Sequence, residues 1–279
     1  MNPIRAEIKD LELEKVIERF ITEECGYRIH VDEYNPTVNG NSVRLSEFIV
    51  SSLQDNCDSN NIEKTSGLVS IEGLDACGKT SAVEAIKQCR QYDSKNIRTT
   101  QEPSEVLWTG DVIRSAIESD KLHPLVVLHL FMLDHKLHSE RVINPVINND
   151  KLVVSDRYID SRVAYQSVSL SEFFTSKHAA ISQLLSLHSN ADWSAFPDKT
   201  LFLDASADTV MERIDKTRGE SEIEKFENKE FLKDVYDSYK KIREVDSIGR
   251  FVTIDAEKPL KNVKSSIQDE IKQEIIEDQ

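Results

Sequence analysis

Gly73, Gly78, Lys79 and Thr80 have the types and spacing of a phosphate-binding loop, Gly-x-x-x-x-Gly-Lys-Thr. Glycines let backbone N–H groups turn toward phosphate oxygens without a steric clash. A lysine at this position reaches the β- and γ-phosphates, and a threonine hydroxyl is a ligand for Mg²⁺. The motif therefore predicts a nucleoside triphosphate site, with a glycine-rich surface turn as the alternative.

The segments on either side of this loop are those that a phosphate-binding loop requires. The apolar run 68–71 predicts a buried strand over 68–72, and the pattern over 79–92 predicts a helix. The helix N-terminus would add a partial positive charge at the phosphates. We expect the nucleotide to be held by the whole loop, which comprises Gly73, Leu74, Asp75, Ala76, Cys77, Gly78, Lys79, Thr80 and Ser81.

Beyond the loop, predicted strands alternate with predicted helices. The strands are 68–72, 97–100, 152–155, 200–204 and 250–254. The helices are 79–92, 105–119, 124–149, 159–188 with a break, 206–216, 228–245 and 259–277. This alternation predicts an α/β fold in which a parallel five-stranded sheet of the P-loop NTPase type is flanked by helices.

Three of the predicted strands end in an aspartate: Asp156, Asp204 and Asp255. Ligands of such folds bind beyond the carboxyl ends of the strands. Asp156 is the best candidate for a carboxylate that, together with Thr80, holds Mg²⁺. The adjacent Arg157 has a planar guanidinium group that can donate two parallel hydrogen bonds to a second phosphate group. An Asp–Arg pair that only stabilises the fold is the alternative.

The composition narrows the class of partner. The net charge is -15, which argues against non-specific binding of nucleic acid or of an anionic membrane. We find no apolar run of about 18 residues and no signal sequence at the N-terminus. The four cysteines lack metal-binding spacing and are typical of reduced thiols, so we expect a cytoplasmic protein.

Residues 1–66 differ from the rest and predict a small, α-rich N-terminal extension. Helical patterns cover 11–26 and 45–53, a strand is expected over 27–31, and a polar linker covers 54–66. His30, Asp32 and Glu33 could bind a metal, but a solvated turn is favoured. We therefore divide the chain into this extension and a nucleotide-binding domain over 67–279.

Four segments together carry a family resemblance. They are Ile-Glu-Gly-Leu-Asp-Ala-Cys-Gly-Lys-Thr (71–80), Thr-Gln-Glu-Pro (100–103), Asp-Arg-Tyr-Ile-Asp-Ser-Arg-Val-Ala-Tyr-Gln (156–166) and Pro-Asp-Lys-Thr-Leu-Phe-Leu-Asp (197–204). In this order they resemble the thymidylate kinase family over about 67–275. The resemblance implies transfer of the γ-phosphoryl group of ATP, with Mg²⁺, to a pyrimidine deoxynucleoside monophosphate, most simply dTMP to dTDP. It also implies a homodimer formed through long helices that include 124–149.

The resemblance assigns roles to individual residues. Asp75 would lie near the reacting centre and the metal. Arg157 and Arg114 would grip the acceptor phosphate, and Phe131 would stack on the base. Tyr165 and Gln166 would close over the sugar and base, and Glu102 with Pro103 would line the acceptor pocket.

The family includes members whose phosphate loop contains an arginine and members that supply basic residues from a lid. This loop lacks an arginine, so the chain resembles the lid style. We expect Arg218, and next Arg213, to neutralise the transferred phosphoryl group together with Lys79. A solvated charged helix is the alternative for these arginines.

The chain departs from the family pattern at the predicted base site. His135 stands where an arginine is usual, and Arg162 stands where a small or amide residue is usual. Both would face the pyrimidine. Arg162 could supply the hydrogen-bond donor that position 135 no longer gives, or the two changes could shift the preference among pyrimidine monophosphates. Alternatively, Arg162 points to solvent or pairs with an acid. Gln101 and Ser104 also depart from the commoner Arg and Gly.

Two other functions stay open from the sequence. A deoxynucleoside kinase would need a general base near the sugar, for which Glu102 is available. A regulatory nucleotide-binding protein would use residues 1–66 to bind a partner. The second is disfavoured because Lys79, Asp75 and the lid arginines are all present.

Overall fold

The computed structural model describes residues 29–30, 37–38, 41–42, 67–88, 97–119, 122–149, 151–189, 196–218, 228–246 and 249–277. The predicted helices over 11–26 and 45–53, the linker 54–66 and the proposed metal residues Asp32 and Glu33 lie outside these ranges. No helix among the described residues is long and apolar enough to cross a membrane.

The described part of the domain is built on a five-stranded sheet in which every neighbouring pair is parallel. The strands lie in the order β5-β6-β4-β7-β8. They are β4 (Leu68–Glu72), β5 (Ile97–Gln101), β6 (Leu152–Asp156), β7 (Lys199–Asp204) and β8 (Phe251–Asp255). The α/β fold predicted from the sequence is therefore confirmed, and β4, which leads into the phosphate loop, occupies the centre.

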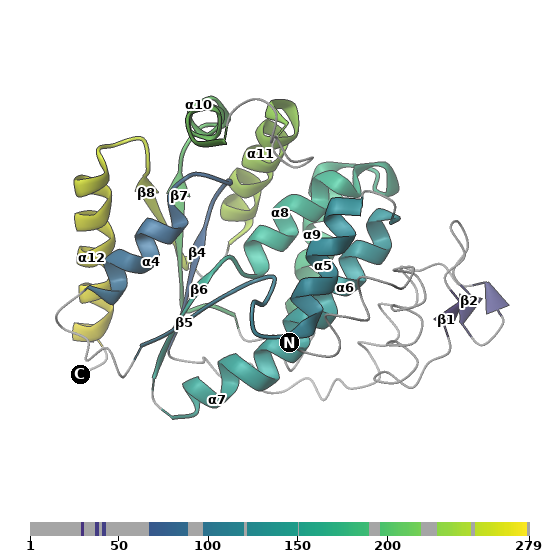
Figure 1. The fold of residues 1–279 in the computed structure, drawn as a ribbon, viewed down its shortest axis with the longest axis horizontal. Coiled ribbons are helices and arrows are strands. Elements are labelled where there is room, and N and C mark those ends of the chain that lie inside the picture. The colour runs from purple at the N-terminus through teal and green to yellow at the C-terminus, as the bar shows by residue number, and fades with distance from the viewer. Residues whose placement is uncertain are drawn as a thin grey trace.

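Helices cover both faces of this sheet (Figure 1). On one face lie α4 (Lys79–Lys87) and α12 (Leu260–Glu277). On the other lie α5 (Trp108–Ser119), α6 (Pro124–His138), α8 (Ile159–Ser169), α9 (Lys177–Ser189) and α11 (Lys229–Val245). The helix α10 (Ala207–Arg218) follows β7 and lies above the carboxyl ends of the strands.

The long helix predicted over 124–149 contains an irregularity. After α6 the backbone forms a π-helical turn, Ser139–Ile143, and then the short helix α7, Asn144–Ile147. Pro145 has no backbone N–H and cannot make the usual helical hydrogen bond. The wider turn before it, in which Asn144 N–H reaches Ser139 O, accommodates this loss.

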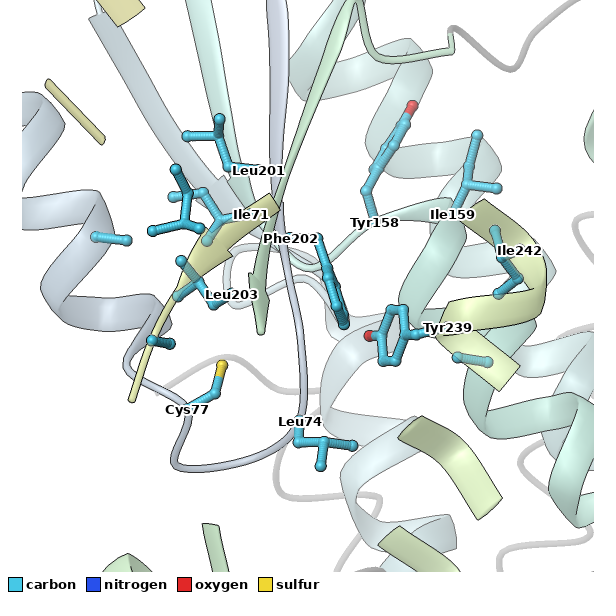
Figure 2. Close-up of a cluster of buried hydrophobic side chains, with 14 of the residues drawn as sticks. Ile71, Leu74, Cys77, Tyr158, Ile159, Leu201, Phe202, Leu203, Tyr239 and Ile242 are labelled. Carbon is cyan, nitrogen blue, oxygen red and sulfur yellow. The ribbon is translucent and has the colours of Figure 1, made fainter. Parts of the chain in front are cut away.

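The core packs directly against the phosphate loop (Figure 2). Strands β4 and β7 contribute buried Ile71, Leu201 and Leu203, while Leu74 and Cys77 extend the same cluster into the loop itself. On the side of the sheet that faces α11, the ring centroid of Tyr239 lies 5.2 Å from the ring centroid of Phe202 in β7. The loop is thus supported from below by apolar packing, which fixes the direction in which its backbone faces.

The described N-terminal residues form a separate small antiparallel sheet. Its strands are β1 (Ile29–His30), β2 (Thr37–Val38) and β3 (Asn41–Ser42). The strand predicted over 27–31 contains β1. The role and boundary of residues 1–66 stay predictions.

Candidate active site

The phosphate loop between β4 and α4 has the backbone geometry that its glycines permit. Gly73 has φ +141°, and a Cβ there would lie 2.8 Å from both Cys77 Sγ and Leu203 O. Gly78, at φ +114°, faces open space and directly precedes Lys79, the first residue of α4. The loop therefore packs closely against β7 at its start and leaves the N-terminus of α4 open to a ligand.

A cavity of about 640 Å³ opens in front of this loop. It extends from the loop to the ends of β5 and β6 and to α10. Its lining comprises Asp75, Ala76, Gly78, Lys79, Thr80, Ser81, Gln101, Glu102, Pro103, Arg114, Asp156, Arg157 and Arg213. The cavity thus brings together three segments that were predicted separately to bind phosphate: the loop, Arg157 and Arg114.

Lys79 is buried, and its ammonium group folds back along the loop. Its Nζ donates to Leu74 O at 2.6 Å and to Gly73 O at 3.3 Å. Both acceptors belong to the loop that would surround a triphosphate. The charge of Lys79 is therefore held at the wall of the cavity, where it is within reach of an anionic ligand.

Asp75 is part of a three-residue contact at the entrance of the loop. Its carboxylate accepts hydrogen bonds from Arg157 Nη2 and from Tyr165 Oη, the latter at 2.7 Å. Although burial alone would raise the pKa of Asp75, the charges of Arg157 and Lys79 and these hydrogen bonds outweigh burial and lower the pKa to about 2. Asp75 is thus a carboxylate at any physiological pH, and it orients the guanidinium of Arg157.

Asp156 and Thr80 both line the cavity and bring oxygen atoms to it. The register of the sheet pairs Ile71 with Asp156, so β6 ends beside the start of the phosphate loop. Among the described residues, no group of three or more His, Cys, Asp or Glu is arranged to hold a metal. One carboxylate and one hydroxyl beside a triphosphate-sized loop fit Mg²⁺, which commonly binds through few protein ligands and substrate phosphates.

Glu102 lies at the centre of a buried polar network. Oε1 accepts from Nδ1 of His135 at 2.8 Å and of His138 at 3.0 Å, and Oε2 accepts from Arg162 Nη2. Arg162 Nη1 also donates to His188 Nε2 at 3.1 Å. Three helical side chains thus converge on one carboxylate just after β5, and His188 joins the network through Arg162.

The charges of this network are balanced. Burial alone would raise the pKa of Glu102, but His135, Arg162 and His138 outweigh burial and hold the pKa well below its usual range. Burial lowers the pKa of His135 to about 4, in spite of Glu102. Burial, with the charge of Arg162, holds the pKa of His188 well below 6.5. At neutral pH the network therefore contains the Glu102 carboxylate, the Arg162 guanidinium, and His135 and His188 in neutral form.

His135 and Arg162 were predicted to face a pyrimidine, but both contact Glu102 and neither residue lines the cavity. For Arg162, pairing with an acid is the alternative that the sequence left open. Two atoms on α8, Arg162 Nε and Gln166 Oε1, are buried and have no hydrogen-bond partner among the described residues. Phe131 packs beside Val112, Ile113, Ala116 and Leu130.

The loop after β5 is fixed between α5 and α6. Ser104 N–H donates to Asp134 Oδ2 at 2.8 Å, and Ser104 Oγ accepts from Val106 and Leu107 N–H at the start of α5. Arg114 Nη2 donates to Ser104 O at 3.2 Å and to Asp111 at 2.8 Å. Ser104, which departs from the family pattern, thus caps the turn that leads into α5.

The two arginines predicted for the lid differ in what the structure describes. Arg213 on α10 donates to Cys77 O at 3.1 Å, Ala76 O at 3.4 Å and Ala256 O at 2.7 Å, so it joins the phosphate loop to the end of β8. Arg218 ends α10, and its side chain lies outside the described atoms, as do residues 219–227.

The sequence analysis missed Glu72, Ser161 and Tyr239 as members of the site. Glu72 ends β4, and its carboxylate accepts hydrogen bonds from both hydroxyls and from Tyr158 N–H. A signal was present, because an acidic residue ends an otherwise apolar buried strand directly before the loop. Tyr239 had no comparable signal, since it lies 166 residues from Gly73, whose carbonyl oxygen is 3.5 Å from its hydroxyl.

Comparison with known proteins agrees with this geometry. A model of the thymidylate kinase family matches residues 71–267. A protein of Methanosarcina mazei named "probable thymidylate kinase" is 36% identical over 200 residues, which are 72% of this chain and 92% of that protein. A protein of the same name from Methanococcoides burtonii is 35% identical over 200 residues, which are 72% and 93% of the two chains. The phosphate loop, the Asp156-Arg157-Tyr158 turn and the parallel sheet that joins them thus belong to a chain of the thymidylate kinase family.

Proposed function

We propose that the protein transfers the γ-phosphoryl group of ATP to dTMP and forms dTDP. The observation that supports this most directly is that two sets of phosphate-binding groups line one cavity. The loop around Lys79 would hold the donor, while Arg157 and Arg114 would hold the acceptor monophosphate. A single cavity with both sets fits an in-line transfer between two nucleotides.

The chemistry asks little of a general base. The attacking oxygen of a monophosphate is already ionised near neutral pH, so the protein needs to align the two phosphates and neutralise charge. Mg²⁺ at Thr80 and Asp156 would supply charge neutralisation on the donor phosphates. Lys79 would add to it from the loop, and Arg213 and Arg218 are the proposed contributors from α10.

Glu102 argues against the alternative of a deoxynucleoside kinase. That reaction needs a carboxylate that can take a proton from a sugar hydroxyl. Both oxygens of Glu102 already accept hydrogen bonds, and its pKa is held well below its usual range. A carboxylate of this kind is a weak base, which favours a monophosphate as the acceptor.

The choice of dTMP rests on the family, whose model matches residues 71–267, and on relatives that are named probable thymidylate kinase. The homodimer, the stacking of Phe131 on the base and the cytoplasmic location stay predictions.

The test is an assay of ADP release by the full chain with ATP and Mg²⁺. The acceptors are dTMP, dUMP, dCMP and thymidine, and Lys79→Met is the matched inactive variant. We expect turnover with dTMP, weaker turnover with dCMP, none with thymidine, and a loss of at least about 100-fold in kcat for Lys79→Met. Turnover with thymidine but not with dTMP would refute the proposal.

A further inference from the structure

Glu72 carries a carboxylate into the interior at the point where the central strand becomes the phosphate loop. Its side chain is fully buried, and no ion pair with Glu72 is found among the described residues. The neighbouring buried carboxylate, Asp160, differs, because Arg250 Nη1 and Nη2 contact it at 2.5 and 2.7 Å. A buried carboxylate without a direct cationic partner is costly, so its other contacts must explain its presence.

Three hydrogen-bond donors converge on Glu72 from three parts of the chain. Tyr158 N–H donates to Oε1 at 2.8 Å, from the turn after β6. The hydroxyl of Ser161, in α8, donates to Oε2, and Tyr239 Oη, from α11, lies 3.2 Å from the same oxygen. The carboxylate therefore joins β4, the turn after β6, α8 and α11 at one point.

These contacts converge on Arg157. Its Nη1 donates to Ser161 Oγ at 3.2 Å and to Gly73 O at 3.3 Å, while Nη2 donates to Asp75. Arg157 has φ +64°, a left-handed conformation that residues other than glycine rarely adopt. The next backbone N–H, that of Tyr158, is the one that Glu72 holds. Glu72 thus reaches both the backbone and the guanidinium of Arg157.

We propose that Glu72 is a positioning residue for phosphoryl transfer, which holds Arg157 toward the acceptor monophosphate through Tyr158 N–H and the hydroxyl of Ser161. Tyr239 completes the contact from α11. The inference rests on the proposed function, in which Arg157 binds the acceptor phosphate.

The negative charge of Glu72 sets the direction of the hydrogen bonds. An ionised carboxylate only accepts, so Ser161 gives its single hydrogen to Glu72 and presents a lone pair to Arg157. A glutamine would behave differently, because Tyr158 N–H would bind its oxygen and turn its NH₂ group toward Ser161. The serine hydrogen would then turn toward Tyr239 Oη, which lies 2.8 Å from Ser161 Oγ, or toward Arg157, which also brings a hydrogen. Glu72→Gln therefore keeps the shape of the side chain but removes the charge that fixes the direction of the hydrogen bond between Ser161 and Arg157.

The pH dependence gives a second readout. Burial and the nearby Asp160 raise the pKa of Glu72 to about 7, against the effects of Ser161 and Arg157. The groups that face Glu72 are Asp160 and Ser161 on α8, Arg157 and Tyr158 after β6, and Tyr239 on α11; the charge of Arg250, which contacts Asp160, also interacts with Glu72. The protonated form has lost the charge that orders the chain of hydrogen bonds. As pH falls below about 7, the wild type should therefore approach the behaviour of Glu72→Gln.

The experiment measures binding of dTMP and thymidine, which differ only in the phosphate, by titration calorimetry on the full chain. The variants are Glu72→Gln, Ser161→Ala and Tyr239→Phe. The matched control is Tyr236→Phe, which removes a hydroxyl from the same helix, bonded there to Asp204 at 2.7 Å. At pH 8 we expect the preference for dTMP over thymidine to fall at least tenfold in Glu72→Gln and Ser161→Ala and about threefold in Tyr239→Phe, with less than twofold change in the control. The difference between the wild type and Glu72→Gln should shrink at pH 6.

Two outcomes would overturn the inference: an unchanged preference in Glu72→Gln and Ser161→Ala, or equal losses for dTMP and thymidine. If Glu72→Gln does not fold, Ser161→Ala and Tyr239→Phe, which each remove one hydroxyl, decide the question. A wild type that prefers dTMP but transfers no phosphoryl group would refute the proposed function and leave Glu72 as a positioning residue for binding of the monophosphate alone. A wild type without preference for dTMP would refute the inference itself.

Discussion

At the scale of single residues, the environment of a side chain decides its role more than its type does. Glu102 and Asp75 are both carboxylates at the cavity wall, and each has an arginine partner. Glu102 is buried among Arg162 and two histidines, whereas the side chain of Asp75 is 36% exposed beside the phosphate loop. The first is suited to fix helices in place, and the second to respond to a ligand.

Removal of Arg162 should destabilise the protein. Arg162→Met would leave Glu102 buried without its permanent cation, which typically costs about 3–5 kcal/mol of unfolding free energy. Urea unfolding measures this loss, and Arg162→Met combined with Glu102→Gln should recover part of it. Lys136→Met is the control, because Lys136 makes an exposed ion pair at 3.9 Å and should change stability by less than about 0.5 kcal/mol. An Arg162→Met variant as stable as this control would contradict the interpretation that Arg162 compensates the buried charge of Glu102.

The low pKa of Asp75 predicts a pH dependence of stability. The pKa in the folded state, about 2, lies below the reference value of 3.8, so the ionised form is favoured by folding. Its contribution is complete above about pH 4 and is lost as pH falls toward 2. The stability difference between the wild type and Asp75→Asn, measured by denaturant unfolding, should therefore be constant near neutrality and shrink between about pH 4 and 2. A stability difference that does not change with pH would show that it does not come from the ionisation of Asp75. Asp237→Asn is the control, because Asp237 forms an exposed ion pair with Lys240 at 3.7 Å.

At the scale of elements, the sequence predicted well what local pattern determines. Strand β4 is an apolar run, and the predicted bounds of the other strands agree with the structure to within a residue at either end. The π-helical turn before α7 was not predicted, because it depends on how the helix adapts to Pro145. The contact of α11 with the phosphate loop through Tyr239 was also not predictable, because periodicity places Tyr239 on a buried face but does not identify its partner.

The approach of α5 to the loop after β5 supplies an element-scale prediction. A Cβ on Gly110 would lie 1.8 Å from Ser104 O, so α5 can pack here only with glycine. Gly110→Ala should push α5 away, lower stability by about 1–3 kcal/mol or more, and raise KM for dTMP because Arg114 binds the same carbonyl. Thermal unfolding and initial rates measure both effects. Gln183→Ala, on the exposed face of α9, is the control. A Gly110→Ala variant with the stability and the KM of this control would show that the loop after β5 moves aside without loss of stability or binding.

At the scale of the whole molecule, the fold explains how distant segments form one site. The parallel sheet places β4, β5 and β6 side by side, and their carboxyl ends bring the loop, Pro103 and Arg157 to one cavity. The motifs indicated which segments meet, because ligands of such sheets bind at this edge. They did not indicate the orientation of Arg162 or Arg213, since these side chains contact segments that are distant in the sequence, Glu102 after β5 and Ala256 after β8.

The division of the chain into an N-terminal extension and a kinase domain gives the last prediction. The match to the Methanosarcina mazei protein takes 92% of that protein but only 72% of this chain, so a chain without such an extension already has the family's length. Within the domain, Gly67 and Leu68 N–H are both held by Asp198 Oδ2, at 2.8 and 2.9 Å, which anchors the start of β4 independently of what precedes it. We therefore expect the truncated chain 67–279 to fold, with kcat and both KM values within about threefold of the full chain. Initial rates on the two proteins measured side by side test this, with Asp198→Asn in the truncated chain as a variant that should weaken the anchor. Loss of activity in the truncated chain with its fold intact would instead assign residues 1–66 a direct part in the site.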